Sequence, residues 1–233
     1  MVCFISLGEK GGKEKMNPKK KGGAYELEIA RDLSLWYTEG KRDDIFFRSH
    51  SSGARATMRS KSGKRTKGQY GDLCASDPIG EPLIKVWTGE CKSGYGRKAT
   101  IRVKGKRREG QKVEVPWCIL DILDSSFKLP KFLELWGEAT AEAKAARGTV
   151  PILFLRRLRK ASLIVMPHYE YTKWRDVFGG NNIPAMIQIR RVWDSEIDIM
   201  NLNDFFIWTK EKPYRRFKQN VFKGKHAKVT FTP

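Results

Sequence analysis

Residues 82–92, PLIKVWTGECK, restrict the possible folds of this chain more than any other segment. They follow YGDLCASD at 70–77 and the turn-like PIGE, a pattern that predicts a β-hairpin. Strand alternation divides the second segment into two faces: Ile84, Val86, Thr88, Glu90 and Lys92 on one, and Leu83, Lys85, Trp87, Gly89 and Cys91 on the other. Both faces carry apolar residues, which predicts a strand near the centre of a sheet.

Helix-type and strand-type patterns alternate along the rest of the chain. A helical pattern at 24–37 precedes a strand at 44–50, and a second helical pattern at 130–147 precedes the strand pair TVPILFLRRL and KASLIVMP. Between them, residues 93–114 have the composition of a protruding ribbon or loop. This order predicts an α/β fold with a mixed central β-sheet flanked by helices.

Composition divides the chain into three parts. Residues 1–19 form a Gly- and Lys-rich leader that we expect to be flexible, with Met16 as an alternative start to Met1. Residues 20–167 hold the predicted core. Residues 168–233 form a C-terminal extension with a basic tail, in which YEYTKWRDVF and NLNDFFIWTK are helical patterns and PAMIQIRRVW is a strand pattern.

The charge balance favours a polyanionic partner. There are 46 Lys and Arg residues against 26 Asp and Glu, a formal net charge of +20. Such an excess favours nucleic acid, and no long apolar run points to a membrane. Hydrophobic residues make up 40% of the chain, enough for a sizeable core.

Four cysteines, at positions 3, 74, 91 and 118, have no CxxC spacing and lie far in sequence from the three histidines. This scatter argues against a zinc site and suits a reducing compartment. We therefore expect an intracellular protein of the cytoplasm or nucleoid, of cellular or viral source.

One acidic residue lies on the apolar side of the first helical pattern. Glu26 falls in the middle of the stripe made by Ile29, Ala30, Leu33, Trp36 and Tyr37. A carboxylate on the buried side of a helix is costly unless it has a partner or a purpose. Glu26 is thus a candidate site residue, with a buried ion pair to a core Arg or Lys as the alternative.

Two further acids and a lysine complete a candidate metal site. The predicted hairpin brings Asp72 and Glu90 side by side, where their carboxylates repel each other unless a divalent cation lies between them. Oxygen ligands suit Mg²⁺, with Mn²⁺ expected to substitute, and the backbone carbonyl of Cys91 is a further candidate ligand. Lys92 lies on the same face as Glu90 and can stabilise an anionic transition state. Taken alone, Glu90 and Lys92 could equally form a surface ion pair.

These residues resemble a known nuclease motif. GD at 71–72 followed by ECK at 90–92 is similar to the acid…acid-x-lysine motif of the PD-(D/E)XK nuclease superfamily. KGGAYELEIARDL, with Lys21, Gly22, Glu26 and Glu28, resembles the helix start of archaeal and phage Holliday-junction resolvases. FFRSHSSG and VPILFLRRL resemble the Arg-Ser strand and a late core strand of the same enzymes, so the similarity covers 20–167.

The resemblance implies a restriction-endonuclease-like core and a homodimer. It makes Glu26, Asp72, Glu90 and Lys92 the catalytic residues, with the first three and the Cys91 carbonyl as metal ligands. The implied function is a Mg²⁺-dependent, structure-selective DNA endonuclease, a Holliday-junction resolvase that acts in DNA recombination and repair. The insertions at 54–69 and 96–114 distinguish this chain from small resolvases, as does its C-terminal extension. Two rivals stay open: another nuclease of the superfamily (restriction-type, nicking or exonucleolytic), and a non-catalytic DNA-binding protein.

The predicted DNA contacts are mostly basic residues that can bind phosphates. The resemblance places Arg48 and Ser52 against substrate, although Arg48 could instead form an ion pair at the sheet edge. The remaining predicted contacts are Lys21, Arg55, Arg59, Lys61, Lys64, Arg65, Lys67, Arg97, Lys98, Arg102, Lys104, Lys106, Arg107 and Arg108. The alternative for the two basic segments is that they are solvated linkers.

Overall fold

A five-stranded mixed sheet forms the centre of the molecule. The computed structural model describes residues 18–49, 70–94, 96–101, 111–123, 129–146, 148–157, 160–192, 195–211, 213 and 217. The strand order is β3 (Trp87–Ser93), β6 (Val150–Arg156), β7 (Ser162–Pro167), β9 (Ser195–Asn201) and β8 (Met186–Val192). β3 and β6 are parallel and all other neighbours are antiparallel. The predicted α/β class with a mixed sheet is confirmed.

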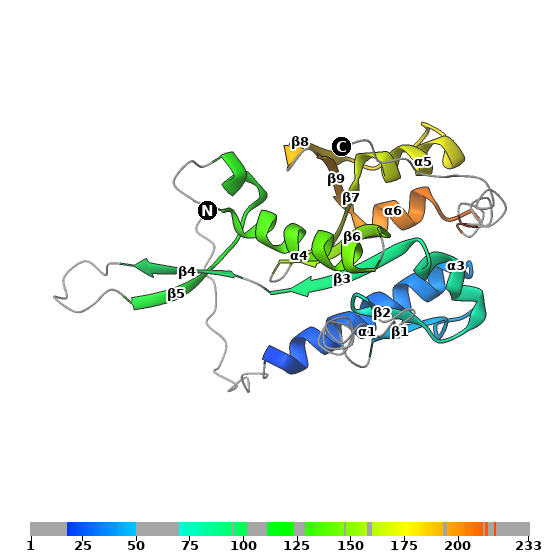
Figure 1. The fold of residues 1–233 in the computed structure, drawn as a ribbon, viewed down its shortest axis with the longest axis horizontal. Helices are drawn as coiled ribbons and strands as arrows, with labels where there is room; N and C mark the ends of the chain where they lie inside the picture. The colour runs from blue at the N-terminus through cyan, green and yellow to red at the C-terminus, as the bar shows by residue number, and fades with distance from the viewer. Residues whose placement is uncertain are drawn as a thin grey trace, which may run out of the picture.

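Helices cover both faces of this sheet (Figure 1). One face packs against α1 (Pro18–Tyr37), α5 (His168–Phe178) and α6 (Leu202–Trp208), and the other against α4 (Lys131–Ala145) and the short η2 (Ile119–Leu123). Alternate residues of β6 divide between the two apolar clusters: Ile152 and Phe154 face α1, whereas Leu153 and Leu155 face α4.

The predicted hairpin between 70–77 and 82–92 is wrong. β2 (Leu73–Ala75) pairs with β1 (Phe46–Arg48), antiparallel, and not with β3. Proline starts two short helical turns in the intervening stretch, η1 (Pro78–Gly80) and α3 (Glu81–Ile84), because a proline suits the first turn of a helix.

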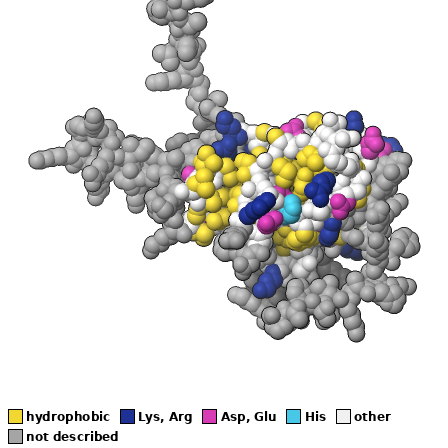
Figure 2. Space-filling model, turned by 90° about the horizontal axis from the view of Figure 1, so that it is seen from above, with side chains coloured by type: hydrophobic (Ala, Val, Ile, Leu, Met, Phe, Trp, Pro, Cys, Tyr) yellow, Lys and Arg dark blue, Asp and Glu magenta, His cyan; other side chains and the backbone are white. Residues whose placement is uncertain are grey.

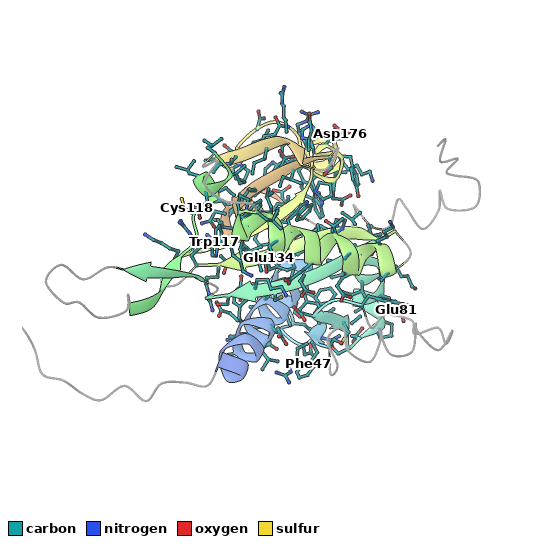
Figure 3. All side chains as sticks on the ribbon, turned by 60° about the vertical axis from the view of Figure 1, so that its left-hand side comes forward. Phe47, Glu81, Trp117, Cys118, Glu134 and Asp176 are labelled. Carbon is teal, nitrogen blue, oxygen red and sulfur yellow. The ribbon has the colours of Figure 1, made fainter. Side chains whose placement is uncertain are left out.

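The position expected for the second strand of that hairpin, near the sheet centre, is also wrong. β3 begins only at Trp87 and lies at the edge of the five-stranded sheet. Its two apolar faces are explained by the layers around it: in Figures 1 and 3, β3 lies between α4 on one side and α1 on the other. A strand buried on both faces therefore need not be a central one.

Most other predicted elements are confirmed. The helical patterns at 24–37 and 130–147 correspond to α1 and α4, although α1 begins earlier than predicted, at Pro18. The predicted ribbon is formed by β4 (Gly96–Ile101) and β5 (Gln111–Pro116), an antiparallel pair that projects from the body. The patterns beyond 167 correspond to α5, β8 and α6, and β9 was missed.

The segment predicted as an extension supplies two strands of the central sheet, β8 and β9. Seen from above in Figure 2, the face that carries α5 and β8 mixes basic, acidic and hydrophobic side chains. Within the described ranges, no helix is long and apolar enough to cross a membrane.

Candidate active site

Asp72 and Glu90 lie close together even though β2 and β3 are not a hairpin. The backbone N–H of Asp72 donates to the carbonyl oxygen of Gly89 at 2.8 Å. The N–H of Cys91 donates to Asp72 Oδ2, also at 2.8 Å. These two bonds fix the Asp72 carboxylate beside β3, between the backbone positions that flank Glu90.

Two glycines allow this close approach. Gly71 has a positive φ of 77°, and a Cβ atom there would lie 2.6 Å from the carbonyl oxygen of Gly89. A Cβ on Gly89 would lie 2.9 Å from Leu73 Cδ1. The GD dipeptide and the glycine before Glu90 are therefore requirements of the site's backbone.

Glu90 and Lys92 point to the α4 side of the sheet. Lys92 Nζ lies 2.8 Å from Glu90 Oε1 and 2.8 Å from Glu138 Oε2. Burial lowers the pKa of Lys92, but the charge of Glu90 and the hydrogen bonds to both glutamates more than reverse this and raise it. Lys92 is therefore a charged ammonium at physiological pH, a hydrogen-bond donor and not a base.

The Asp72 carboxyl is destabilised in its charged form. Burial, followed by the charge of Glu90, raises the pKa of Asp72 to about 7, and the hydrogen bond from Cys91 only partly offsets this. The pKa of Glu26, on α1, is also raised, by burial and by Glu90, while Arg48 and Lys92 act in the opposite direction. Three carboxylates thus share one electrostatic environment, as expected from the sequence.

Arg48 reaches the first turns of α1. A Cβ atom on Gly23 would collide with the Arg48 guanidinium, so Gly23 leaves the space that this side chain fills. The charge of Arg48 lowers the pKa of Glu26, so the two side chains lie near each other, but no ion pair between them is found among the described residues.

Sequence reasoning missed two acids on α4. Glu138 contacts Lys92, and Glu142 lies close enough to Gly71 and Lys92 for both to lower the pKa of its carboxyl. Burial and the charge of Glu90 raise the pKa of Glu142. The two glutamates are one turn apart and flank the buried stripe that contains Ala139 and Ala143, but only the crossing of α4 over β3 brings them to the site.

The donor set suits a hard cation. Asp72, Glu90 and the Cys91 carbonyl supply oxygen ligands, which Mg²⁺ prefers, and Mg²⁺ completes its octahedral shell with water. Among the described residues, no three His, Cys, Asp or Glu side chains already converge as a metal-binding group. The buried Cys91 thiol has a pKa raised well above its usual value, chiefly by burial, so it is not a thiolate ligand.

Most of the predicted DNA-contacting residues lie outside the part of the chain that the structure describes. These are Ser52, Arg55, Arg59, Lys61, Lys64, Arg65, Lys67, Arg102, Lys104, Lys106, Arg107 and Arg108. For Lys21 in α1 and for Arg97 and Lys98 in β4, the backbone is described and the side chain is not.

Comparison with protein-family models, curated proteins and solved structures finds no match to this chain.

Proposed function

We propose that this chain is a Mg²⁺-dependent endonuclease of the PD-(D/E)XK type that hydrolyses phosphodiester bonds in branched DNA, four-way junctions above all. The observation that carries the proposal is the placement of Asp72 against the Cys91 backbone, beside Glu90, with Lys92 two residues further along the same strand.

In this proposal Asp72, Glu90 and the Cys91 carbonyl would hold the cation, which would supply an activated water and neutralise phosphate charge. Lys92 donates hydrogen bonds from its ammonium to the scissile phosphate, where negative charge develops. Glu26 orients the attacking water from the α1 side of the site. Arg48, beside Glu26, contacts a neighbouring phosphate.

The β4–β5 ribbon supports DNA as the substrate. It leaves the body four residues after Lys92, so its base lies next to the proposed cleavage point. Residues 96–116 contain eight Lys or Arg and two Glu. A basic ribbon at this place can follow the phosphates of a duplex arm, and two subunits of a homodimer can cut the paired strands of a junction.

A panel of labelled substrates tests this proposal. We expect Mg²⁺-dependent cleavage of four-way junctions, no cleavage in EDTA, and much slower cleavage of linear duplex. Preferential cutting of flaps or plain duplex would favour another nuclease of the same superfamily. Binding to all substrates without cleavage in either Mg²⁺ or Mn²⁺ would leave a DNA-binding protein and overturn the proposal.

The homodimer is tested separately by analytical ultracentrifugation. We expect a mass twice the 26.8 kDa of the chain, with or without a junction bound. A monomer that cuts both strands of a junction would contradict this part of the proposal.

A further inference from the structure

We infer that Glu138, on α4, is a positioning residue that keeps Lys92 in the site when Glu90 is engaged by a divalent cation. The inference rests on the proposed function, because it assumes a cation at Asp72 and Glu90. It gives Glu138 a role distinct from metal binding: to be the second partner of the lysine.

The ammonium of Lys92 is shared between two carboxylates. Its Nζ atom is 2.8 Å from an oxygen of Glu90, on its own strand, and 2.8 Å from an oxygen of Glu138, on the helix above. Lys92 and Glu90 have side chains only 13% and 11% exposed, whereas Glu138 is 46% exposed. Lys92 and Glu90 are thus largely sheltered from water, whereas Glu138 is partly exposed to it.

Glu90 cannot serve the lysine and a dication equally well. The two cations repel each other, and each competes for the oxygens of the same carboxylate. Without Glu138, the Lys92 ammonium would depend more strongly on the Glu90 oxygens and would compete with the cation for them. A second carboxylate removes this conflict.

Glu138 is held where it can do this. It lies on α4, whose neighbouring residues Leu135, Trp136 and Ala139 are buried against the sheet, so the helix is fixed over β3. Glu138 is the α4 carboxylate whose oxygen lies 2.8 Å from Lys92 Nζ.

Mn²⁺ affinity, measured by electron paramagnetic resonance without DNA, tests the inference. The variants are Glu138→Gln, Lys92→Met and the double variant. We expect Glu138→Gln to weaken Mn²⁺ binding at least about threefold, because Lys92 then competes for Glu90. Lys92→Met should bind Mn²⁺ more tightly than wild type, and Glu138→Gln should have a much smaller effect in that background.

Glu134→Gln is the matched control. Glu134 is on the same helix, is 47% exposed and pairs with Lys131 at 2.7 Å. It should leave Mn²⁺ binding unchanged. In cleavage assays at saturating Mg²⁺, Glu138→Gln should lower kcat with little change in KM for DNA, while Glu134→Gln alters neither.

The outcomes distinguish a failure of the positioning role of Glu138 from a failure of the cation site at Asp72 and Glu90. If Glu138→Gln weakens Mn²⁺ binding equally with and without Lys92, its effect is one of charge alone and the positioning role is wrong. An equal effect of Glu134→Gln would overturn it as well. If wild type binds no Mn²⁺, or Asp72→Asn binds it as wild type does, the proposed cation site itself fails.

Discussion

At the scale of single residues, the site contains a buried carboxylate whose charged form lowers the stability of the fold. Asp72 is buried, lies beside Glu90, and has a pKa raised to about 7, chiefly by burial. Its charged form is tolerated only through the N–H of Cys91 and the nearby lysine. Buried carboxylates with raised pKa values are typical of functional sites, although structural networks can produce them too.

This gives a pH dependence with a definite sign. Because the folded-state pKa of Asp72 lies above its ordinary value of 3.8, the folded protein binds more protons between about pH 4 and 7, and Asp72 lowers the free energy of unfolding as pH rises through this window. In EDTA, Asp72→Asn should be more stable than wild type at pH 8, by about 1–3 kcal/mol, and much less so at pH 4.

Urea unfolding of both proteins at pH 4 and pH 8 measures this difference. Asp176→Asn, at an exposed position on α5, is the control and should behave as wild type does at both pH values. Equal stability of wild type and Asp72→Asn at pH 8 would show that the Asp72 carboxylate is not destabilised by its surroundings.

Gly71 offers a second residue-scale prediction. Gly71 and Gly148 have nearly the same positive φ, 77° and 76°, but only Gly71 has neighbours that a Cβ atom would meet. Gly148→Ala should therefore cost about 1–2 kcal/mol for the left-handed backbone alone. Gly71→Ala should cost clearly more, and it should also abolish cleavage by displacing Asp72 from β3.

Thermal and urea unfolding of the two alanine variants compare these costs. The difference between them isolates the contact with the Gly89 carbonyl from the backbone conformation. If both variants lose the same stability and both still cut DNA, the close approach of β2 to β3 is not what builds the site.

At the scale of elements, local patterns were predictable and long-range pairings were not. The stripe from Ile29 to Tyr37 is buried as its helical period predicts, because that period is a property of α1 itself. The partner of β3 is β6, about 60 residues later in the sequence, and no local pattern specifies a parallel partner. The hairpin does not form because Pro78 and Pro82 each start a short helical turn between β2 and β3.

The candidate site divides in the same way. Asp72, Glu90 and Lys92 could be predicted because motif spacing placed them together, even though the predicted strand pairing was wrong. Glu138 and Glu142 could not, since their role depends on where α4 crosses the sheet. β9 was missed because its segment, SEIDIMN, places Asp198 among apolar residues, and this acid is fully buried in the fold.

At the scale of elements, we predict that basic residues of the β4–β5 ribbon contribute to DNA affinity. Replacing Arg97, Lys98 and Lys112 with alanine should weaken junction binding and reduce the slope of log affinity against log salt by about 2–3, if each residue contacts one phosphate. Fluorescence anisotropy over a range of salt concentrations measures both quantities.

A matched triple variant controls for lost charge. Lys173, Arg175 and Arg190 are exposed on α5 and β8, two elements that lie apart from the β4–β5 ribbon in Figure 1. Replacing them should change the salt slope much less. Equal effects of the two triple variants would mean that net charge, and not the ribbon, sets DNA affinity.

At the scale of the whole molecule, the candidate site residues come together at one edge of the central sheet. α1 brings Glu26, the β1–β2 pair brings Arg48 and Asp72, β3 brings Glu90 and Lys92, and α4 brings Glu138. From β3 the sheet extends through β6, β7, β9 and β8, away from these residues. We propose that this edge of the sheet is a phosphodiesterase centre.

Cleavage of a labelled four-way junction in Mg²⁺ by wild type, Asp72→Asn and Lys92→Ala tests that claim most directly. Lys131→Ala serves as the control, because Lys131 pairs with Glu134 outside the site. We predict that all four proteins bind the junction, that wild type and Lys131→Ala cut it, and that Asp72→Asn and Lys92→Ala are slower by at least about 100-fold. Cleavage by Asp72→Asn at the wild-type rate would contradict the assignment of this site.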